Sequence, residues 1–351
     1  MRAKHRGVRF KGSYLSISYL TAAIPVTKEI PPTVSVIIVS WNAKRYVLEC
    51  LTSLHRNTGT IPLEIIVVDN NSSDGTPDEI RTQFPDAILI QNATNLGFAK
   101  ANNIGLAIAR GRYLCLINSD VVILDDCIEK MVSFMNDNPG IGLLGPKMLA
   151  PDGAIGQSVM RLPTVWNTLC CSLGLHVLFP TSKVFGGFLR NNYKYDMIDD
   201  VEVLTGWFWM VRRSALDDVG RLDERFFMYG EDVDWSFRFR KAGWRVVFYP
   251  GAEALHYGAA SSAQAPTRFY LEMRRATLQY FRKHHGHIGG MGYKFAVLVH
   301  ELVRIFGHGL LYCFRAPARP LAALALDRSW CSLIWLAKAK PERPYSRKDG
   351  I

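Results

Sequence analysis

The chain has 351 residues, of which 48% are hydrophobic and 21% are charged, so it can build a full α/β core and a smaller second unit. Its formal net charge of +11 is unevenly distributed. Residues 1–11 carry +5, and residues from 260 onward carry 15 Lys or Arg against 5 Asp or Glu, which leaves residues 12–259 near −4. This distribution excludes a strongly basic central portion, and only the two ends suit an anionic partner such as phospholipid or nucleic acid.

Strands and helices are expected to alternate along the first half of the chain, because apolar runs and helical spacing alternate there. Strands are expected at 34–40, 64–69, 87–91 and 113–118, with 121–124 continuing past a polar break. Helices are expected at 43–56, from a cap at Asp74 to about Phe84, and at 97–109. This alternation predicts an α/β fold with a mainly parallel sheet flanked by helices.

The second half follows a looser pattern that looks antiparallel and is rich in aromatic residues. A helix is expected at 232–241 and a strand at 244–249, and amphipathic helices past Pro266 carry the basic excess. We expect a basic N-terminal extension, a central α/β domain in two halves, and a basic helical C-terminal region. The expected ranges are 1–32, 33–265 (divided into 33–124 and 125–265) and 266–351.

The cysteines and the candidate targeting segments indicate in which cellular compartment the protein is expected. The seven cysteines are scattered and include no C-x-x-C pair, which indicates buried free thiols in a reducing compartment and argues against zinc. Residues 14–23 superficially resemble a signal peptide, but four hydroxyl side chains weaken its apolar core, so secretion is not expected. Charged and histidine side chains interrupt the apolar stretch 295–314, which argues against a spanning helix.

Several apolar runs stop abruptly at carboxylates, amides or hydroxyls, as buried parallel strands do when their carboxyl ends line a ligand crevice. The chain has no G-x-x-x-x-G-K-[ST] motif and no G-x-G-x-x-G after the first strand, so a phosphate cradled by a glycine-rich turn is not expected. If the crevice binds a phosphate ligand, a divalent metal is then the obvious group to hold it.

Four segments, 36–42, 67–76, 116–120 and 230–235, together resemble the family 2 glycosyltransferases with the GT-A fold. They occur in the family's order and approximate spacing over roughly residues 33–260. The resemblance implies a GT-A nucleotide-diphospho-sugar transferase fold with a C-terminal helical extension. The central domain, 33–265, would then be the glycosyltransferase domain, with 33–124 as its nucleotide-binding half and 125–265 as its acceptor half. The resemblance also implies a nucleotide-diphospho-sugar donor and a divalent cation, Mg²⁺ or Mn²⁺.

Asn118-Ser119-Asp120 lies where the family usually has Asp-x-Asp. The resemblance implies Asp120 as a metal ligand, and Asn118 as a weak ligand or a ribose contact; the alternative is that the triplet only ends a strand. His256 matches a late His of the family, which implies a contact with the metal or the diphosphate. An isolated His is otherwise more often an ordinary core or surface group.

Gly230-Glu231-Asp232-Val233-Asp234 places three carboxylates within four residues, which costs energy unless something compensates. Asp234 has an ordinary explanation, because Arg238 lies at i+4 on the same helix face. Glu231 and Asp232 match the family's acidic pair. The resemblance therefore implies Asp232 as the catalytic base, with Glu231 orienting donor or acceptor hydroxyls.

The remaining candidates are substrate contacts. Asp69 ends the second strand and by resemblance accepts the imide N–H of uracil or thymine, and Asn42 and Asn95 are expected to contact the donor. Gly97 is expected to allow a close approach of backbone. Trp207, whose indole could stack on a sugar, is the acceptor-site candidate, although aromatic residues in this segment can also be core.

The mechanism expected from the resemblance is a single in-line displacement that inverts the anomeric carbon. Among branches of the family, the motifs look most like bacterial rhamnosyltransferases of cell-surface polysaccharide assembly, which implies dTDP-rhamnose and a glycan or lipid-linked acceptor. UDP-galactofuranose, other UDP-sugars and GDP-mannose stay open. The competing hypothesis is a basic membrane- or nucleic-acid-binding protein with a degenerate transferase domain. Nucleic acid is not expected, because the basic ends lack interleaved aromatic repeats.

The C-terminal region predicts the location of the protein. Apolar residues recur at 3–4 spacing inside a tail of net +10, namely Leu298, Leu302, Ile305, Phe306 and Leu310. We expect a cytoplasmic protein bound peripherally at the inner face of the cell membrane. The alternative is that this stripe packs on the catalytic domain or on a second subunit. The oligomeric state is left open.

Overall fold

The computed structural model describes residues 31–57, 59–182, 184–186, 193–258, 266–315, 317 and 319–338. The chain divides into two compact units, Met1–Ile30 and Pro31–Ile351, and every described residue belongs to the second. Most of the expected N-terminal extension, including the signal-like stretch 14–23, and the tail after Lys338 lie outside the described residues. The expected domain boundaries stay predictions.

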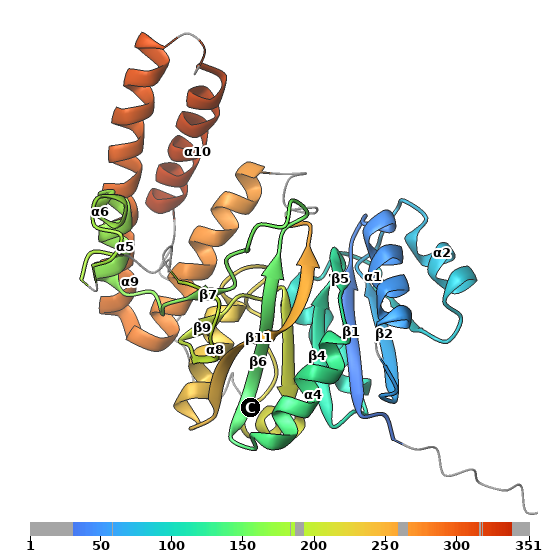
Figure 1. Ribbon diagram of the computed structural model, residues 1–351. Coiled ribbons are helices and arrows are strands. Elements are labelled where there is room, and N and C mark those ends of the chain that lie inside the picture. Colours follow the sequence, from blue (N-terminus) through green and yellow to red (C-terminus); the bar gives the residue numbers. More distant parts are fainter. Residues whose placement is uncertain are drawn as a thin grey trace, which may run out of the picture. The chain divides into compact units, whose positions relative to one another are not determined.

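A large sheet forms the centre of the fold (Figure 1). Its strands follow the order β3-β2-β1-β4-β10-β6-β11-β5, and β8 pairs with β11. The strands are β1 (Val34–Ser40), β2 (Leu63–Asp69), β3 (Ile88–Gln91), β4 (Tyr113–Asn118), β5 (Val121–Ile123), β6 (Ile141–Leu149), β8 (Asp199–Asp200), β10 (Phe208–Arg212) and β11 (Arg245–His256). Strands β7 (Val159–Met160) and β9 (Val203–Leu204) pair separately.

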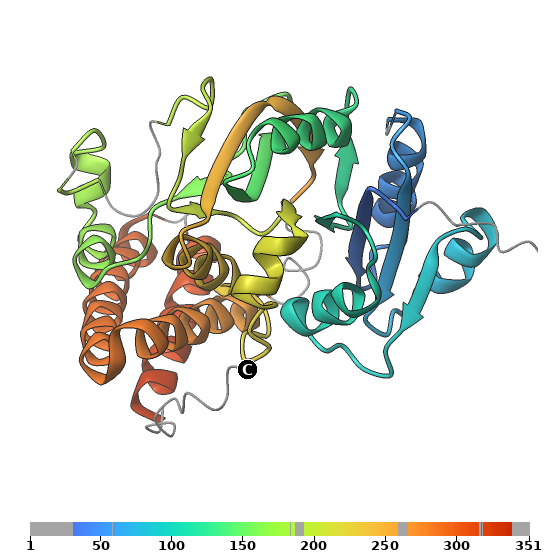
Figure 2. The ribbon, with the colours of Figure 1, turned by 90° about the horizontal axis from the view of Figure 1, so that it is seen from below.

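Helices cover both faces of the sheet (Figures 1 and 2). They are α1 (Lys44–Arg56), α2 (Thr76–Gln83), α3 (Phe98–Ile108), α4 (Cys127–Asp137), α5 (Val165–Ser172), α6 (Leu175–Leu178), α7 (Arg213–Val219), α8 (Glu231–Lys241), α9 (Pro266–Phe314) and α10 (Arg319–Lys338). Side-chain alternation in β1 explains the layers: Val36 and Ile38 pack in the core with α1 and α4, whereas Ile37 packs in the core with α3 and α8. All three side chains are fully buried.

The predicted fold class, a mainly parallel sheet flanked by helices with a helical C-terminal extension, is confirmed. Strands β1, β2, β3 and β4 are parallel neighbours, and β10 enters antiparallel between β4 and β6. The strand expected at 244–249 is longer than predicted, because β11 continues through an irregularity between Tyr249 and Glu253 and ends at His256. The expectation of buried free thiols holds for Cys50, Cys115, Cys127 and Cys170, whereas Cys171 and Cys331 are half-buried and Cys313 is exposed.

The C-terminal helices extend from the sheet unit, and α9 changes direction at Gly286, where φ is 64°. The part before the bend packs against Phe226 and α8, and the part after it packs on α5 and α10. Among the described residues, α9 is the one helix long and apolar enough to cross a membrane, by length and composition only. The expectation that it does not span a bilayer stays a prediction.

Candidate functional site

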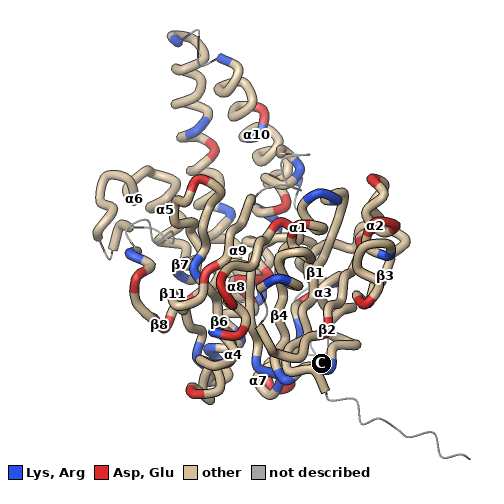
Figure 3. The backbone as a smooth tube through the Cα atoms, turned by 45° about the vertical axis from the view of Figure 1, so that its right-hand side comes forward, with Lys and Arg blue, Asp and Glu red and all other residues tan. Residues whose placement is uncertain are grey.

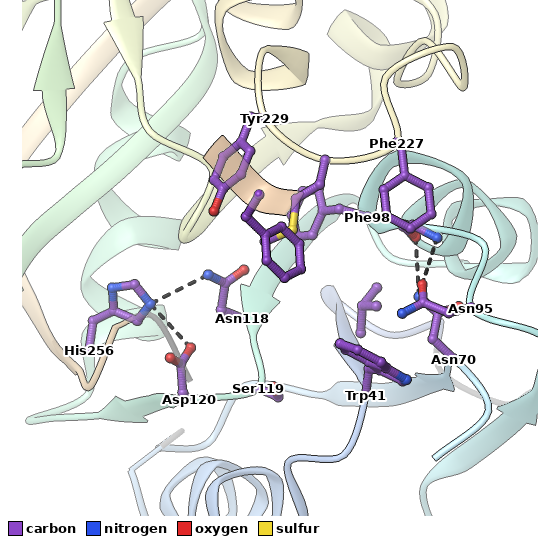
Figure 4. A pocket seen from close by; sticks show the side chains of 14 residues that line it. Trp41, Asn70, Asn95, Phe98, Asn118, Ser119, Asp120, Phe227, Tyr229 and His256 are labelled. Carbon is purple, nitrogen blue, oxygen red and sulfur yellow. Dashed lines mark hydrogen bonds and ion pairs between the residues drawn. The ribbon is translucent and has the colours of Figure 1, made fainter. Parts of the chain in front are cut away.

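The candidate site lies at the carboxyl ends of β1 and β4. This is a topological switch point, because β2 and β3 continue the sheet to one side of β1 while β4 lies on the other. A pocket of about 240 Å³ opens there (Figure 4). Its lining residues are Val39, Trp41, Asn70, Asn95, Gly97, Phe98, Asn118, Ser119, Asp120, Phe227, Met228, Tyr229, His256 and Phe269.

One side of the pocket brings together three predicted residues: Asn118, Asp120 and His256 (Figure 4). His256 Nε2 lies 3.1 Å from Asp120 Oδ1 and 3.4 Å from Asn118 Nδ2. Strand pairing brings these side chains together, because β4 ends at Asn118 and β11 pairs with β5 so that His256 lies opposite Val121. The N–H of Tyr257 also donates to the carbonyl of Asp120 at 3.0 Å.

The opposite side of the pocket carries amides and a close backbone contact. Asn95 accepts a hydrogen bond from the N–H of Gly97 at 2.9 Å, and Asn70 donates to the carbonyl of Gly97 at 3.2 Å. Gly97 has φ 82°, and a β-carbon there would lie 2.3 Å from the carbonyl oxygen of Phe227. A glycine therefore fits this position without a clash, because the loop before α8 crosses the backbone at contact distance. The predicted place of Gly97 in a substrate-binding loop stays a prediction.

Asp69 and Asn42 do not line the pocket but brace the loops that form it. Asp69 is fully buried and accepts from the N–H of Ser72 at 2.9 Å, and its Oδ1 has no partner within the described part of the chain. Asn42, at φ 47°, accepts from the N–H of Ser73 at 2.8 Å. The orphaned Asp69 oxygen is an acceptor that a donor N–H could satisfy. The predicted substrate contacts of both residues stay predictions.

The two catalytic candidates begin α8. Glu231 is buried, Asp232 is half-buried, and Asp232 Oδ1 accepts from the N–H of Val233 at 2.8 Å. Burial raises the pKa of Asp232 to about 6, although backbone hydrogen bonds oppose this. Burial and the neighbouring Asp232 charge raise the pKa of Glu231 well above its usual range. Asp232 is thus mostly ionised at neutral pH but remains basic enough to accept a proton.

A short turn joins these carboxylates to the metal side of the pocket. A β-carbon at Gly206 would lie 3.7 Å from Cβ of Asp232, so this turn passes directly beside the predicted base. The next residue, Trp207, is only 3% exposed, and its ring stacks on His256 with centroids 5.5 Å apart. Trp207 therefore supports His256 from within the core, and its predicted acceptor contact stays a prediction.

Asp234 is fully buried and forms a charge cluster with three partly buried partners. We call this cluster the Asp234 clamp; it consists of Asp234, Arg238, Lys283 and His284. The partner nitrogens lie 2.8 Å (Arg238 Nε), 2.6 Å (Lys283 Nζ) and 2.7 Å (His284 Nε2) from the carboxylate. Burial alone would raise the pKa of Asp234, but the hydrogen bond from His284 and the charges of Arg238 and Lys283 hold it well below its usual range. The expected Arg238 pair is confirmed, and α9 is tied to the helix that carries Asp232.

Sequence reasoning missed the aromatic wall of the pocket. Trp41 belongs to the first motif but was given no role, whereas Tyr229 precedes the acidic motif and Phe269 comes from α9. In Figure 4 Trp41 lies on one side of the pocket and Tyr229 on the other. Tyr229 has φ 68°, a conformation that non-glycine residues rarely adopt. An aromatic next to a Gly-Glu-Asp motif is a usable signal for Tyr229, but nothing local in the sequence marks Phe269.

The residues present fit a divalent cation. In the described part of the chain no three His, Cys, Asp or Glu residues converge on one metal position. Asp120 and His256 can supply two ligands, and a hard cation such as Mg²⁺ or Mn²⁺ commonly takes its other ligands from substrate phosphates and water. Asn118 is in place for a third, weaker contact. Such an ion would neutralise the charge of a diphosphate leaving group.

Comparisons with known proteins agree with this geometry. Residues 35–220 match the protein family described as glycosyl transferase family 2. The N-acetylglucosaminyl-diphospho-decaprenol L-rhamnosyltransferase of Mycobacterium tuberculosis is 29% identical over 71% of this chain and 84% of its own length. A low-salt glycan biosynthesis hexosyltransferase of Haloferax volcanii is 24% identical over 70% of this chain and 74% of its own. A mannosyltransferase of Pyrobaculum calidifontis, solved with GDP-Man and Mn²⁺, superposes with a TM-score of 0.51 at 16% identity, covering 89% of each chain, which shows a shared fold.

Proposed function

Since the chain belongs to glycosyl transferase family 2 and is a nucleotide-sugar glycosyltransferase, we propose that it transfers L-rhamnose from dTDP-rhamnose to a lipid-linked or polysaccharide acceptor. The product would be a cell-surface glycan. The name of the mycobacterial relative specifies transfer of L-rhamnose and a lipid-linked acceptor, and so supports the sugar and the acceptor class, at 29% identity over most of both chains. UDP-galactofuranose, another UDP-sugar or GDP-mannose are the alternative donors.

The arrangement of the polar groups supports a single displacement with inversion. Asp120 and His256 would hold the diphosphate end of the donor through a divalent cation, and the amide side of the pocket with Trp41 would hold the nucleoside. Asp232 would take the proton of the acceptor hydroxyl as that oxygen bonds to the anomeric carbon. Glu231, with its raised pKa, would keep its proton and donate a hydrogen bond to a sugar hydroxyl.

One observation carries the proposal: Asp120 and His256 are 136 residues apart in sequence, yet their side chains meet at 3.1 Å in the pocket at the switch point. A structural ion pair alone would not need to face a pocket lined by amides and aromatic rings. Such a combination of convergent polar groups and apolar lining is typical of a ligand site.

A donor panel tests the function. The full chain is incubated with dTDP-rhamnose, UDP-galactofuranose, other UDP-sugars and GDP-mannose, with Mn²⁺ or with EDTA, and nucleotide release is measured. We expect release from dTDP-rhamnose with Mn²⁺ only. Full release in EDTA would contradict the metal assignment, and release from another donor would replace dTDP-rhamnose by that sugar. Binding of nucleic acid without affinity for any nucleotide sugar would favour the competing hypothesis.

We also propose that the protein works at the cytoplasmic face of the cell membrane as a peripheral protein. The net +10 of the residues from 260 onward and the exposed apolar side chains of α9 support this location. Cell fractionation followed by a high-salt wash tests it. Salt-dependent release from the membrane fraction is expected, and recovery in the soluble fraction at low salt would contradict it.

A further inference from the structure

Helix α10 turns small side chains toward the protein and several large apolar side chains outward. Its small side chains are buried, namely Ala322, Ala325, Ser329 and Ser332. Four large apolar side chains are exposed, namely Leu321, Leu324, Trp330 and Ile334, whereas Trp335 and Leu336 near the end of the helix pack against the core that α9 shares. A helix that packs on a protein core in water turns its large apolar side chains inward. Small residues between helices with large apolar residues outside are typical of helices surrounded by lipid.

The partner of α10 shows the same property. We call residues 287–314 of α9 together with α10 the C-terminal hairpin. On α9, Phe306 is 72% and Phe314 82% exposed, and Leu302 is 55% exposed. An 18-residue window of this helix has a mean hydropathy of 1.3, but only 11% of it is buried in the protein. A core helix of similar hydropathy would be mostly buried, so the described part of the chain leaves an apolar surface of α9 uncovered.

Charges on the outer part of the C-terminal hairpin have one sign. Between Glu301 and Asp327 the chain has no Asp or Glu, but it has Arg304, Arg315 and Arg319. Arg315 and Arg319 are exposed at the end of the hairpin, which Figure 3 shows as blue. An apolar surface that ends in cations is complementary to a bilayer with anionic headgroups.

The base of the hairpin is fixed to the helix segment that lines the pocket. Glu301 is fully buried and accepts from Tyr270 OH at 2.7 Å and from Arg274 at 3.2 Å. Tyr270 follows Phe269, which lines the pocket. In Figure 1 the hairpin extends past the edge of the sheet at which β6 and β11 end. Because β1 and β4 run in the same direction as β6, their carboxyl ends and the pocket lie at this edge too. The hairpin end and the pocket therefore face the same side.

We propose that the outer end of the C-terminal hairpin, residues 302–315 and 319–326, inserts into an anionic phospholipid bilayer and so turns the pocket toward the membrane. A lipid-linked acceptor would then meet the donor without leaving the bilayer. The acceptor part of this proposal rests on the proposed function, but the binding of lipid does not.

Vesicle sedimentation tests the lipid partner. Full-length protein is spun with vesicles of phosphatidylcholine alone or of equimolar phosphatidylcholine and phosphatidylglycerol. A triple variant, Phe306→Ser with Phe314→Ser and Leu321→Ser, should lower the partition coefficient at least roughly 100-fold, because three large apolar side chains no longer enter the bilayer. A matched control, Ile88→Ser with Ile108→Ser and Met197→Ser, removes exposed apolar side chains elsewhere and should bind as the wild type does.

The charges are tested separately. Arg315→Gln with Arg319→Gln should lower binding to the anionic vesicles by roughly 25-fold, about fivefold for each charge, and should leave binding to neutral vesicles unchanged. Equal binding of the triple variant and the wild type would overturn the proposal. It would also be overturned if the wild type were a dimer without lipid that the triple variant dissociates, because the surface would then be a subunit interface.

Donor turnover in solution separates the two proposals. The triple variant should release nucleotide from the donor at the wild-type rate when no lipid is present, because none of its substitutions touches the pocket. Vesicle binding without any donor turnover would overturn the proposed function and leave the lipid surface standing. Donor turnover without hairpin-dependent vesicle binding would overturn the lipid surface and leave the proposed function standing.

Discussion

Lys283→Met tests whether α9 holds the catalytic helix. The substitution keeps the length of the side chain but removes the ammonium that lies 2.6 Å from Asp234 Oδ1 and 2.8 Å from Asp223 Oδ2. Asp234 is fully buried and stays so. Removing one partner of a buried ion pair costs about 3–5 kcal/mol. Since Arg238 and His284 remain beside Asp234, we expect the free energy of unfolding to fall by about 3 kcal/mol.

Urea unfolding at neutral pH measures this loss. The control Lys130→Met removes an exposed lysine on α4 and should change stability by less than about 0.5 kcal/mol. Asp234→Asn should also destabilise the protein, and the double variant should lose less than the sum of the two, by about 1–3 kcal/mol. Asp234 has a lowered pKa, so its contribution is present above the pKa of an unfolded Asp and is lost as the pH falls through the folded pKa.

A kinetic measurement distinguishes positioning from mere stabilisation. With Lys283 absent, the negative charge of Asp234 is less neutralised and disfavours ionisation of the neighbouring carboxylates. We expect the acid limb of the kcat/KM profile to move to higher pH in Lys283→Met and to stay in place in Lys130→Met. If Lys283→Met were no less stable than the Lys130 control and had an unshifted profile, the reasoning about the Asp234 clamp would be refuted.

Three further predictions concern the pocket. For the wild type, kcat/KM should rise with pH around 6, because Asp232 must lose its proton to act as a base; a flat profile through pH 6 would argue against it. Asp232→Asn should remove the rise of kcat/KM near pH 6 and lower the rate of sugar transfer by about 10²–10⁴. If Asp234→Asn lowered the transfer rate more than Asp232→Asn did, with the fold intact, the catalytic base would have been assigned to the wrong carboxylate. Gly97→Ala should destabilise the protein more than Gly153→Ala does. Both glycines have φ near +80°, so both substitutions add backbone strain of about 1–3 kcal/mol, but only a β-carbon at Gly97 would meet the Phe227 carbonyl. Equal losses of stability in thermal unfolding would contradict the clash.

The sheet could be predicted from the sequence because its signals are local. The run 34–40 is apolar and ends in polar residues, and the structure has β1 at Val34–Ser40. The same holds for 113–118, which is β4, and the two carboxyl ends then meet at the switch point. Parallel pairing places the polar ends together without further information, which is why Asn118 and Asp120 could be assigned to one pocket.

The parts that could not be predicted depend on contacts distant in sequence. Nothing near Phe269 indicates that it lines the pocket, and nothing near Lys283 indicates that it reaches Asp234 from 49 residues away. Trp207 shows a further limit. Trp207 lies in the core, which the sequence left open for aromatic residues of this segment, but its stacking on His256 depends on where β11 ends. Tertiary packing decides which distant residues such side chains contact, and local sequence propensity gives no indication of these contacts.

Donor binding and transfer in Asp120→Asn, with Asp152→Asn as control, test the central claim most directly. Asp120 faces the pocket beside His256, whereas Asp152 lies in an exposed turn. We predict that Asp120→Asn loses Mn²⁺-dependent binding of the nucleotide diphosphate, measured by calorimetry, together with sugar transfer, while Asp152→Asn keeps both. If Asp120→Asn bound and transferred like the control, the pocket between β1 and β4 would not be the donor site.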